Sequence, residues 1–203
     1  MAADKNQIIN RALVKLGSRP ITNLEDDDTP ESRTALNVYD MALGMILSET
    51  LWTFATKRVL LALLSDTIVF ANDKESGLQY IYSRPTDIIR VFSTNDDSAY
   101  WKEEGNTIVS DTSGLGLIYT YRNEDTSTYA PHFAYALSDL VAAEMAFPLL
   151  NSRSKTEDLY AFYEKVSLPK AISQNAQIGT PKELNDNYYL NARHGGPNVQ
   201  ELS

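Results

Sequence analysis

Apolar residues near the start of the chain recur at the spacing of one helix face. They are Ile8, Ile9, Ala12, Leu13 and Leu16. Gly17 follows them directly, and glycine is the residue that most often ends a helix in a left-handed conformation. The pattern therefore predicts a short first helix that ends at Gly17.

The second helical pattern is the longest in the chain. It begins at Thr29 and Pro30, because a threonine hydroxyl can cap the first turn and proline needs no N–H at the first helical position. One face then stays largely apolar for about seven turns. Its members are Leu36, Tyr39, Leu43, Ile46, Leu47, Thr50, Leu51 and Phe54. We expect one helix that runs to Phe54, with Trp52 and Phe54 in the core.

The pattern changes after Thr56 to short β-rich segments separated by turn residues. The predicted strands cover residues 58–64, 67–71, 78–82, 87–92, 107–109 and 115–121. Short strands at this spacing indicate an antiparallel sheet. A parallel sheet is disfavoured, because no segment of helical length alternates with the strands.

The helical period returns after Pro131. The shared apolar face comprises Phe133, Leu137, Leu140, Val141, Met145 and Phe147. Pro148 is expected to end or kink this helix, since proline lacks the N–H that a helix interior uses. A capping box at 154–157 predicts a further helix, and Pro169 is expected to kink it.

The end of the chain has no helical or strand period. Residues 179–203 are rich in asparagine and contain Pro181, Pro197 and two adjacent glycines. Such a composition predicts an extended or disordered tail. The expected fold class is α+β. An antiparallel helical bundle is formed by 1–56 and 130–178, an antiparallel β module by 57–129, and a flexible C-terminal tail by 179–203.

Composition excludes several kinds of site. The 203 residues include no cysteine and two histidines, so disulfides, thiolate metal sites, cysteine nucleophiles and a three-histidine zinc site are excluded within one chain. The net charge is −9, which disfavours broad contact with a phosphate backbone or an anionic membrane. The charge is uneven, because residues 61–130 hold eleven acidic and five basic side chains.

Hydropathy points to a protein without a membrane span. No uninterrupted apolar run approaches about 18 residues, and the polar N-terminus lacks the apolar core of a signal peptide. We therefore expect a chain that is made in the cytoplasm and folds there in soluble form.

Candidate catalytic residues do not form a recognisable set. The acidic run 26–28 is interpreted as a solvated turn, because consecutive side chains diverge and no calcium-loop spacing follows. Glu103 and Glu104 are adjacent on a predicted hairpin, so they face opposite ways and cannot flank one bond. His132 is interpreted as a packing or interface residue, and His194 lies in the tail without a partner. We expect no catalytic residues, no metal and no cofactor.

The tail carries an aromatic cluster that a monomeric globule does not explain. Tyr188, Tyr189 and Leu190, together with Arg193, are the candidate partner-binding residues. Aromatic side chains in disordered segments often dock on a partner. The alternative is a flexible end without a function.

Several motifs, taken in order, resemble a known family. They are Leu16-Gly17 followed by Pro20-Ile21, Trp52-x-Phe54, Tyr82 with Pro85-x-Asp87 and Arg90, and Trp101 through Gly105 to Ile108. This series is similar to the head-to-tail adaptor proteins of tailed bacteriophages, in particular the tail tubular protein A family of short-tailed phages. The resemblance spans roughly residues 5–178.

The resemblance implies a structural virion protein rather than an enzyme. Members of the family form a ring, usually of twelve copies, between the portal and the tail nozzle, and DNA passes through its channel during ejection. The implied partners are the portal protein, the nozzle protein, tail fibres and further copies of the chain, and the implied location is the head–tail junction of the virion. An acidic channel wall would repel the DNA backbone and let it slide. A hydrolytic, wall-degrading tail component and a peptide-binding module are the alternatives.

Overall fold

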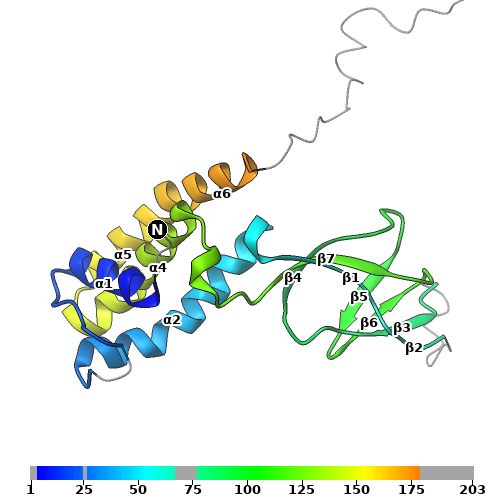
Figure 1. Ribbon diagram of the computed structural model, residues 1–203, viewed down its shortest axis with the longest axis horizontal. Helices are drawn as coiled ribbons and strands as arrows, with labels where there is room; N and C mark the ends of the chain where they lie inside the picture. The colour runs from blue at the N-terminus through cyan, green and yellow to red at the C-terminus, as the bar shows by residue number, and fades with distance from the viewer. Residues whose placement is uncertain (1–3, 25–26, 67–76, 179–203) are drawn as a thin grey trace, which may run out of the picture.

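The computed structural model describes residues 4–24, 27–66 and 77–178, and within them the chain has an α+β fold. The helices lie at one end of the long axis and the strands at the other (Figure 1). The order along the chain is helices, strands, then helices again, which is the order that the sequence predicts.

Helix α4 (Pro131–Leu150) lies at the centre of the helical part. The other helical elements are α1 (Lys5–Leu16), α2 (Pro30–Glu49), α5 (Arg153–Phe162), the π turn η3 (Tyr163–Ser167) and α6 (Leu168–Ala176). All of them pack on α4, and twelve of the 20 residues of α4 are buried. Phe147 is an exception to the predicted apolar face, because it lies in the last turn of α4 and is half exposed.

Among the described residues, α4 alone has the length and composition of a membrane-spanning helix. Its most apolar window is, however, 67% buried inside the protein. Packing against the neighbouring helices accounts for this apolar composition, as it does for any central helix. The expectation that the chain has no membrane span stays a prediction.

The predicted helix ends are mostly confirmed by local geometry. Gly17 ends α1 with φ 73°, and the Thr29 hydroxyl accepts a hydrogen bond from the Ser32 N–H at 3.2 Å at the start of α2. The predicted capping box at 154–157 is wrong by two residues. Ser152 is the capping residue of α5, because its hydroxyl accepts from the Lys155 N–H at 3.3 Å.

The long helix is shorter than predicted, because α2 ends at Glu49 rather than at Phe54. Side chains take over the hydrogen bonds of its last carbonyl groups, which no further helical turn satisfies. Trp52 Nε1 donates to the Ile46 carbonyl at 2.9 Å, and Arg90 Nη1 donates to the Ser48 carbonyl at 2.9 Å. The chain then forms a short 3₁₀ turn, η1 (Thr53–Ala55), which leads into the first strand.

The two prolines act differently from one another. The helix that contains Pro148 continues for two residues and ends where Asn151 adopts φ 48°. Pro169 sits in the first turn of α6, directly after the π turn η3, so the helical path continues through it. A π turn shifts the hydrogen-bond register, and this shift accommodates the N–H that proline lacks.

The strands form two antiparallel sheets rather than one. One sheet has the order β1 (Thr56–Leu60), β7 (Gly116–Tyr121), β4 (Ile88–Thr94). The other has the order β2 (Leu63–Ser65), β3 (Tyr80–Ser83), β6 (Thr107–Ser110), β5 (Trp101–Glu104). All the pairings are antiparallel, as predicted.

Two strand predictions need correction. The predicted strand 58–64 is divided between β1 and β2, because the chain changes sheets at the buried Leu61, whose N–H donates to the Leu115 carbonyl at 2.9 Å. Strand β5 is additional to the predicted strands and forms the hairpin with β6. The predicted strand 67–71 lies outside the described residues.

Buried side chains form two hydrophobic clusters. The larger cluster belongs to the helices and includes Leu13, Leu43, Phe133 and Leu140. The smaller lies between the sheets and consists of Leu61, Tyr82, Ile88, Ile108, Leu115, Leu117 and Tyr119. That residues 57–129 form a separable module stays a prediction.

Candidate functional site

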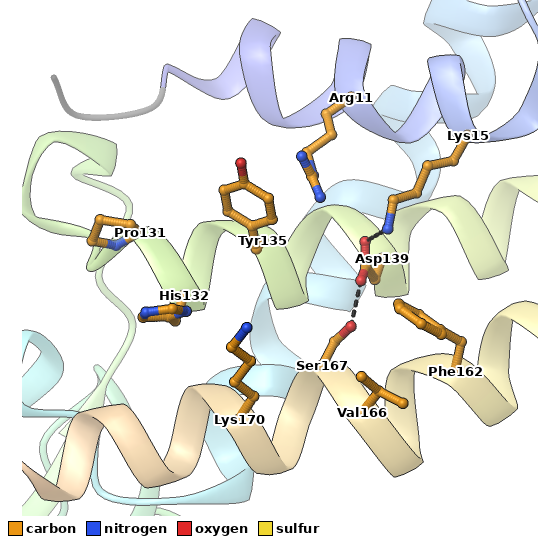
Figure 2. Close-up of a pocket in the computed structure, with 10 residues that line it drawn as sticks. All are labelled: Arg11, Lys15, Pro131, His132, Tyr135, Asp139, Phe162, Val166, Ser167 and Lys170. Carbon is orange, nitrogen blue, oxygen red and sulfur yellow. Dashed lines mark hydrogen bonds and ion pairs between the residues drawn. The ribbon is translucent and has the colours of Figure 1, made fainter.

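A groove of about 400 Å³ lies in the helical part, over the surface of α4 (Figure 2). Its floor is α4, one wall is α1, and the opposite wall is formed by the end of α5, the π turn and α6. The lining residues are Arg11, Lys15, Pro131, His132, Tyr135, Asp139, Phe162, Val166, Ser167 and Lys170. The first helix and the last helical segments of the described chain therefore contribute to one site.

The groove gathers three cationic side chains around one carboxylate. Figure 2 shows Arg11 and Lys15 reaching into it from α1 and Lys170 reaching into it from α6. Asp139 is the one acidic residue in the lining. With neutral histidine the lining carries two positive charges in excess, although the whole chain has a net charge of −9.

Both carboxylate oxygens of Asp139 have partners within the protein. Its side chain is 5% exposed and forms an ion pair with Lys15, whose side chain is 25% exposed. The hydroxyl of Ser167 donates a hydrogen bond to the other carboxylate oxygen (Figure 2). Asp139 thus joins α1, α4 and the π turn, and its negative charge is offset by Lys15.

Arg11 is held in place by two contacts with α4. Its Nε donates to the Ser138 hydroxyl at 3.0 Å, and its guanidinium carbon lies 3.5 Å from the centre of the Tyr135 ring. Within the described part of the chain, neither Arg11 nor Lys170 forms an ion pair with a carboxylate. Both cations remain available to an anion.

The wall opposite α1 is apolar. Phe162 and Val166 line the groove and are each about half exposed, as is Tyr135 on the floor. The Lys15 ammonium lies 5.2 Å from the centre of the Phe162 ring. The site therefore presents a cationic side and an aromatic or aliphatic side to the same space.

The π turn explains why Ser167 and Phe162 line the groove together. A π turn adds a residue to the helical repeat, so side chains on either side of it rotate relative to a regular helix. Its last residue, Ser167, contacts Asp139, while Lys170 follows in α6. Turns of this kind are frequent at functional sites.

Among the candidate residues that the structure describes, His132 alone lies in the groove. His132 is half buried in the lining of the groove. Glu103 and Glu104 lie on a hairpin, where each forms its own ion pair, with Arg84 and Lys102 respectively. The candidate partner-binding residues Tyr188, Tyr189, Leu190 and Arg193, together with His194, lie outside the described residues.

The acidic run 26–28 is described only from Asp27 onward. The carboxylate of Asp27 accepts hydrogen bonds from the Thr22 and Asn23 N–H groups at 2.6 and 3.2 Å, and Asp28 pairs with Arg33. These contacts belong to a turn rather than a cation site. No group of three or more metal-ligating side chains occurs among the residues that the structure describes.

Sequence reasoning missed the groove. A signal was present, because Arg11 and Lys15 are four residues apart and share one face of the first predicted helix. Nothing in the pattern places Lys170 or Phe162 opposite that face, since their position depends on the packing of α5 and α6 on α4.

No protein-family model matches the chain, and no curated protein is significantly similar to it.

Proposed function

We propose that the protein is a head-to-tail adaptor of a short-tailed bacteriophage. In this role, copies of the chain form a ring, with twelve as the expected number, between the portal and the tail nozzle. The helices serve as a bundle that packs beside neighbouring copies and under the portal, and the strands face the tail. The 179–203 tail docks on a partner through Tyr188, Tyr189 and Leu190, with Arg193 beside them.

The observation that supports this proposal most is where the motif residues lie. Trp52 and Phe54 belong to an aromatic cluster at the junction between the helices and the strands. The Trp52 and Phe133 rings are 4.8 Å apart, Phe54 and Phe133 are 4.7 Å apart, and Phe54 and Tyr129 are 5.3 Å apart. The cluster joins the segment after α2 to the start of α4.

A second pair of motif residues lies at the same junction. Asp87 accepts hydrogen bonds from Lys57 and from the Tyr119 hydroxyl, the latter at 3.1 Å, so it ties together the three strands of one sheet. Arg90, in β4, donates to the Ser48 carbonyl at the end of α2. The motif side chains thus fix how the helices and the strands are oriented toward each other.

Fixed orientation is what an adaptor requires. A subunit that contacts a portal with one end and a nozzle with the other must hold its two ends in a set geometry. Because a ring repeats each contact in every copy, a small error in that geometry would accumulate around the circle. The motif residues therefore make sense as structural residues rather than as a reaction centre.

The test is electron microscopy of the purified chain mixed with portal rings of the same phage. The expected result is an additional ring of density on the portal, with no such ring when the chain is alone at micromolar concentration. A chain without residues 180–203 is the matched variant, and it should stay folded but bind the portal poorly. Absence of density with the full chain would contradict the adaptor proposal.

The hydrolytic alternative has its own test. Zymography on peptidoglycan should show no clearing. Glu103→Ala and Glu104→Ala should leave infectivity nearly unchanged, because each side chain forms a partly exposed ion pair. Clearing by the wild-type chain that one of these variants abolishes would favour the enzyme.

The junction also yields a pH-dependent prediction for Asp87→Asn. Partial burial opposes ionisation of Asp87, but hydrogen bonds from Lys57 and Tyr119 and the charge of Lys57 outweigh it and lower the pKa of the carboxyl. A carboxyl whose pKa is lowered by folding stabilises the folded state fully at pH values above its pKa in the unfolded chain, about 3.9. This stabilisation is lost as the pH falls toward the pKa of the carboxyl in the folded protein.

Asp87→Asn should therefore lower the free energy of unfolding at pH 7 by up to about 1 kcal/mol, because the pair with Lys57 is partly exposed. Urea unfolding at pH 7 and at pH 3 measures this difference. The gap between variant and wild type should shrink at pH 3, and a gap that widens there would contradict the assignment.

A further inference from the structure

We propose that the groove over α4 binds an acidic segment of a partner protein. Arg11 and Lys170 hold a carboxylate of that segment, and an adjacent apolar side chain of the segment packs on Phe162 and Val166. This inference uses the described residues of the groove alone, so it does not depend on the adaptor proposal.

The charge of the groove favours an anionic ligand. Lys15 is already paired with Asp139, whereas Arg11 and Lys170 face the same space without a carboxylate partner among the described residues. Cations that converge in a part-enclosed space repel one another, and an incoming carboxylate relieves this repulsion.

Arg11 is preorganised to bind a carboxylate. Its Nε is used by Ser138 and its face lies on Tyr135, which leaves the two terminal nitrogens of the guanidinium as donors. A planar guanidinium matches the two oxygens of a carboxylate, and stacking reduces the entropy that binding would otherwise cost.

The apolar wall defines the rest of the ligand. Phe162, Val166 and Tyr135 are large and about half exposed, although many side chains of their type are buried. The groove volume of about 400 Å³ holds a few side chains and excludes a folded domain. A short peptide with alternating acidic and apolar residues fits both features, whereas a bare inorganic anion leaves the apolar wall exposed.

Nucleic acid fits the groove less well. Backbone binding needs many cations along an open path, and its strength grows with the number of phosphates that are neutralised. The groove supplies three cations, one of them already paired, on a chain with a net charge of −9.

The experiment uses fluorescence anisotropy with the full chain and a fluorescein-labelled peptide of the sequence Glu-Phe-Glu-Leu-Glu. One comparison peptide has glutamine in place of every glutamate, and another has alanine in place of phenylalanine and leucine. Inorganic phosphate and an oligothymidine of similar length serve as competitors. The matched variants are Arg11→Gln/Lys170→Gln in the groove and Arg153→Gln/Lys155→Gln, which removes two exposed charges at the start of α5.

The affinity for the parent peptide should fall at least about tenfold in the groove variant, because a charge-assisted hydrogen bond is lost. In the α5 variant it should fall less than about twofold. Both comparison peptides should bind more weakly than the parent peptide. Affinity should fall when salt rises from about 0.05 to about 0.5 M, because salt screens the partly exposed charges.

Several outcomes would overturn the proposal. They are failure of the parent peptide to bind at about millimolar concentration, equal binding by the glutamine peptide, equal binding by the groove variant, and displacement by oligothymidine at lower concentration than by free peptide. Self-association of the wild type that the groove variant abolishes would identify a second copy as the occupant instead. Lys170→Gln alone keeps the test valid if the double variant unfolds, because Lys170 is exposed.

Discussion

Trp52→Ala is expected to lower the free energy of unfolding by about 3 to 5 kcal/mol, near the upper limit for a single truncation. Trp52 is 1% exposed and is the largest of the fully buried side chains among the described residues. Its ring meets Phe133 edge to face at 4.8 Å and lies 6.1 Å from Phe54. Trp52 belongs to the larger, helical cluster, and truncation would leave a cavity there that close-packed neighbours such as Phe133 cannot fully fill.

Part of this loss comes from a hydrogen bond. The indole N–H donates to the Ile46 carbonyl, one of the groups that α2 leaves without a helical partner at its end. Trp52→Phe keeps most of the apolar contact but leaves this buried carbonyl unsatisfied, so its expected cost is about 1 to 3 kcal/mol. The difference between the two variants separates packing from hydrogen bonding.

Urea unfolding followed by circular dichroism measures both variants. Tyr100→Ala is the control, because Tyr100 is 54% exposed and its truncation should change the free energy by less than about 0.5 kcal/mol. A cost below about 1.5 kcal/mol for Trp52→Ala would mean that the junction tolerates the cavity and that the aromatic cluster does not hold the two parts together.

Local chemistry allowed much of the fold to be predicted. Gly17, Thr29 with Pro30, and Pro131 each mark a helix end that depends on a few neighbouring residues, and all three positions are confirmed. The helix ends need no knowledge of distant segments. The antiparallel direction of the strands is predicted as well, but their partners are not.

The wrong predictions concern helix ends and strand bounds that depend on contacts with distant segments of the chain. Helix α2 ends early because Trp52 and Arg90 satisfy its last carbonyls, and Arg90 lies 42 residues away from Ser48. The predicted strand 58–64 is divided because β1 pairs with β7 and β2 pairs with β3. No periodicity in a single segment reveals which partner it will meet.

The groove is the clearest case of this limit. Its cations come from α1 and α6. Even the two that are nearest to each other in the sequence, Lys15 and Lys170, are separated by most of the chain. On the sequence each lysine looks like an ordinary solvated charge. Their convergence requires α5, the π turn and α6 to fold back along α4, and the sequence shows only that Pro169 disturbs a helix there.

The ion pair in the groove leads to an asymmetric prediction. Lys15→Met is expected to lower the free energy of unfolding by about 3 kcal/mol or more, because it leaves the Asp139 carboxylate buried without its cation. Asp139→Ala should cost less, about 2 kcal/mol, because the Lys15 ammonium is 25% exposed and can turn to water. The carboxylate has no such route, since its side chain is 5% exposed.

The double variant Lys15→Met/Asp139→Ala completes a thermodynamic cycle measured by urea unfolding. Because the two side chains contact each other, the double variant should cost less than the sum of the single ones, by about 1 to 3 kcal/mol. Lys155→Met, which removes an exposed lysine from α5, should change stability by less than about 0.5 kcal/mol. Additive costs, or a larger loss for Asp139→Ala than for Lys15→Met, would contradict this prediction. Either result would mean that Ser167 is the main partner of Asp139. Lys15 would then be free to bind an anion together with Arg11 and Lys170.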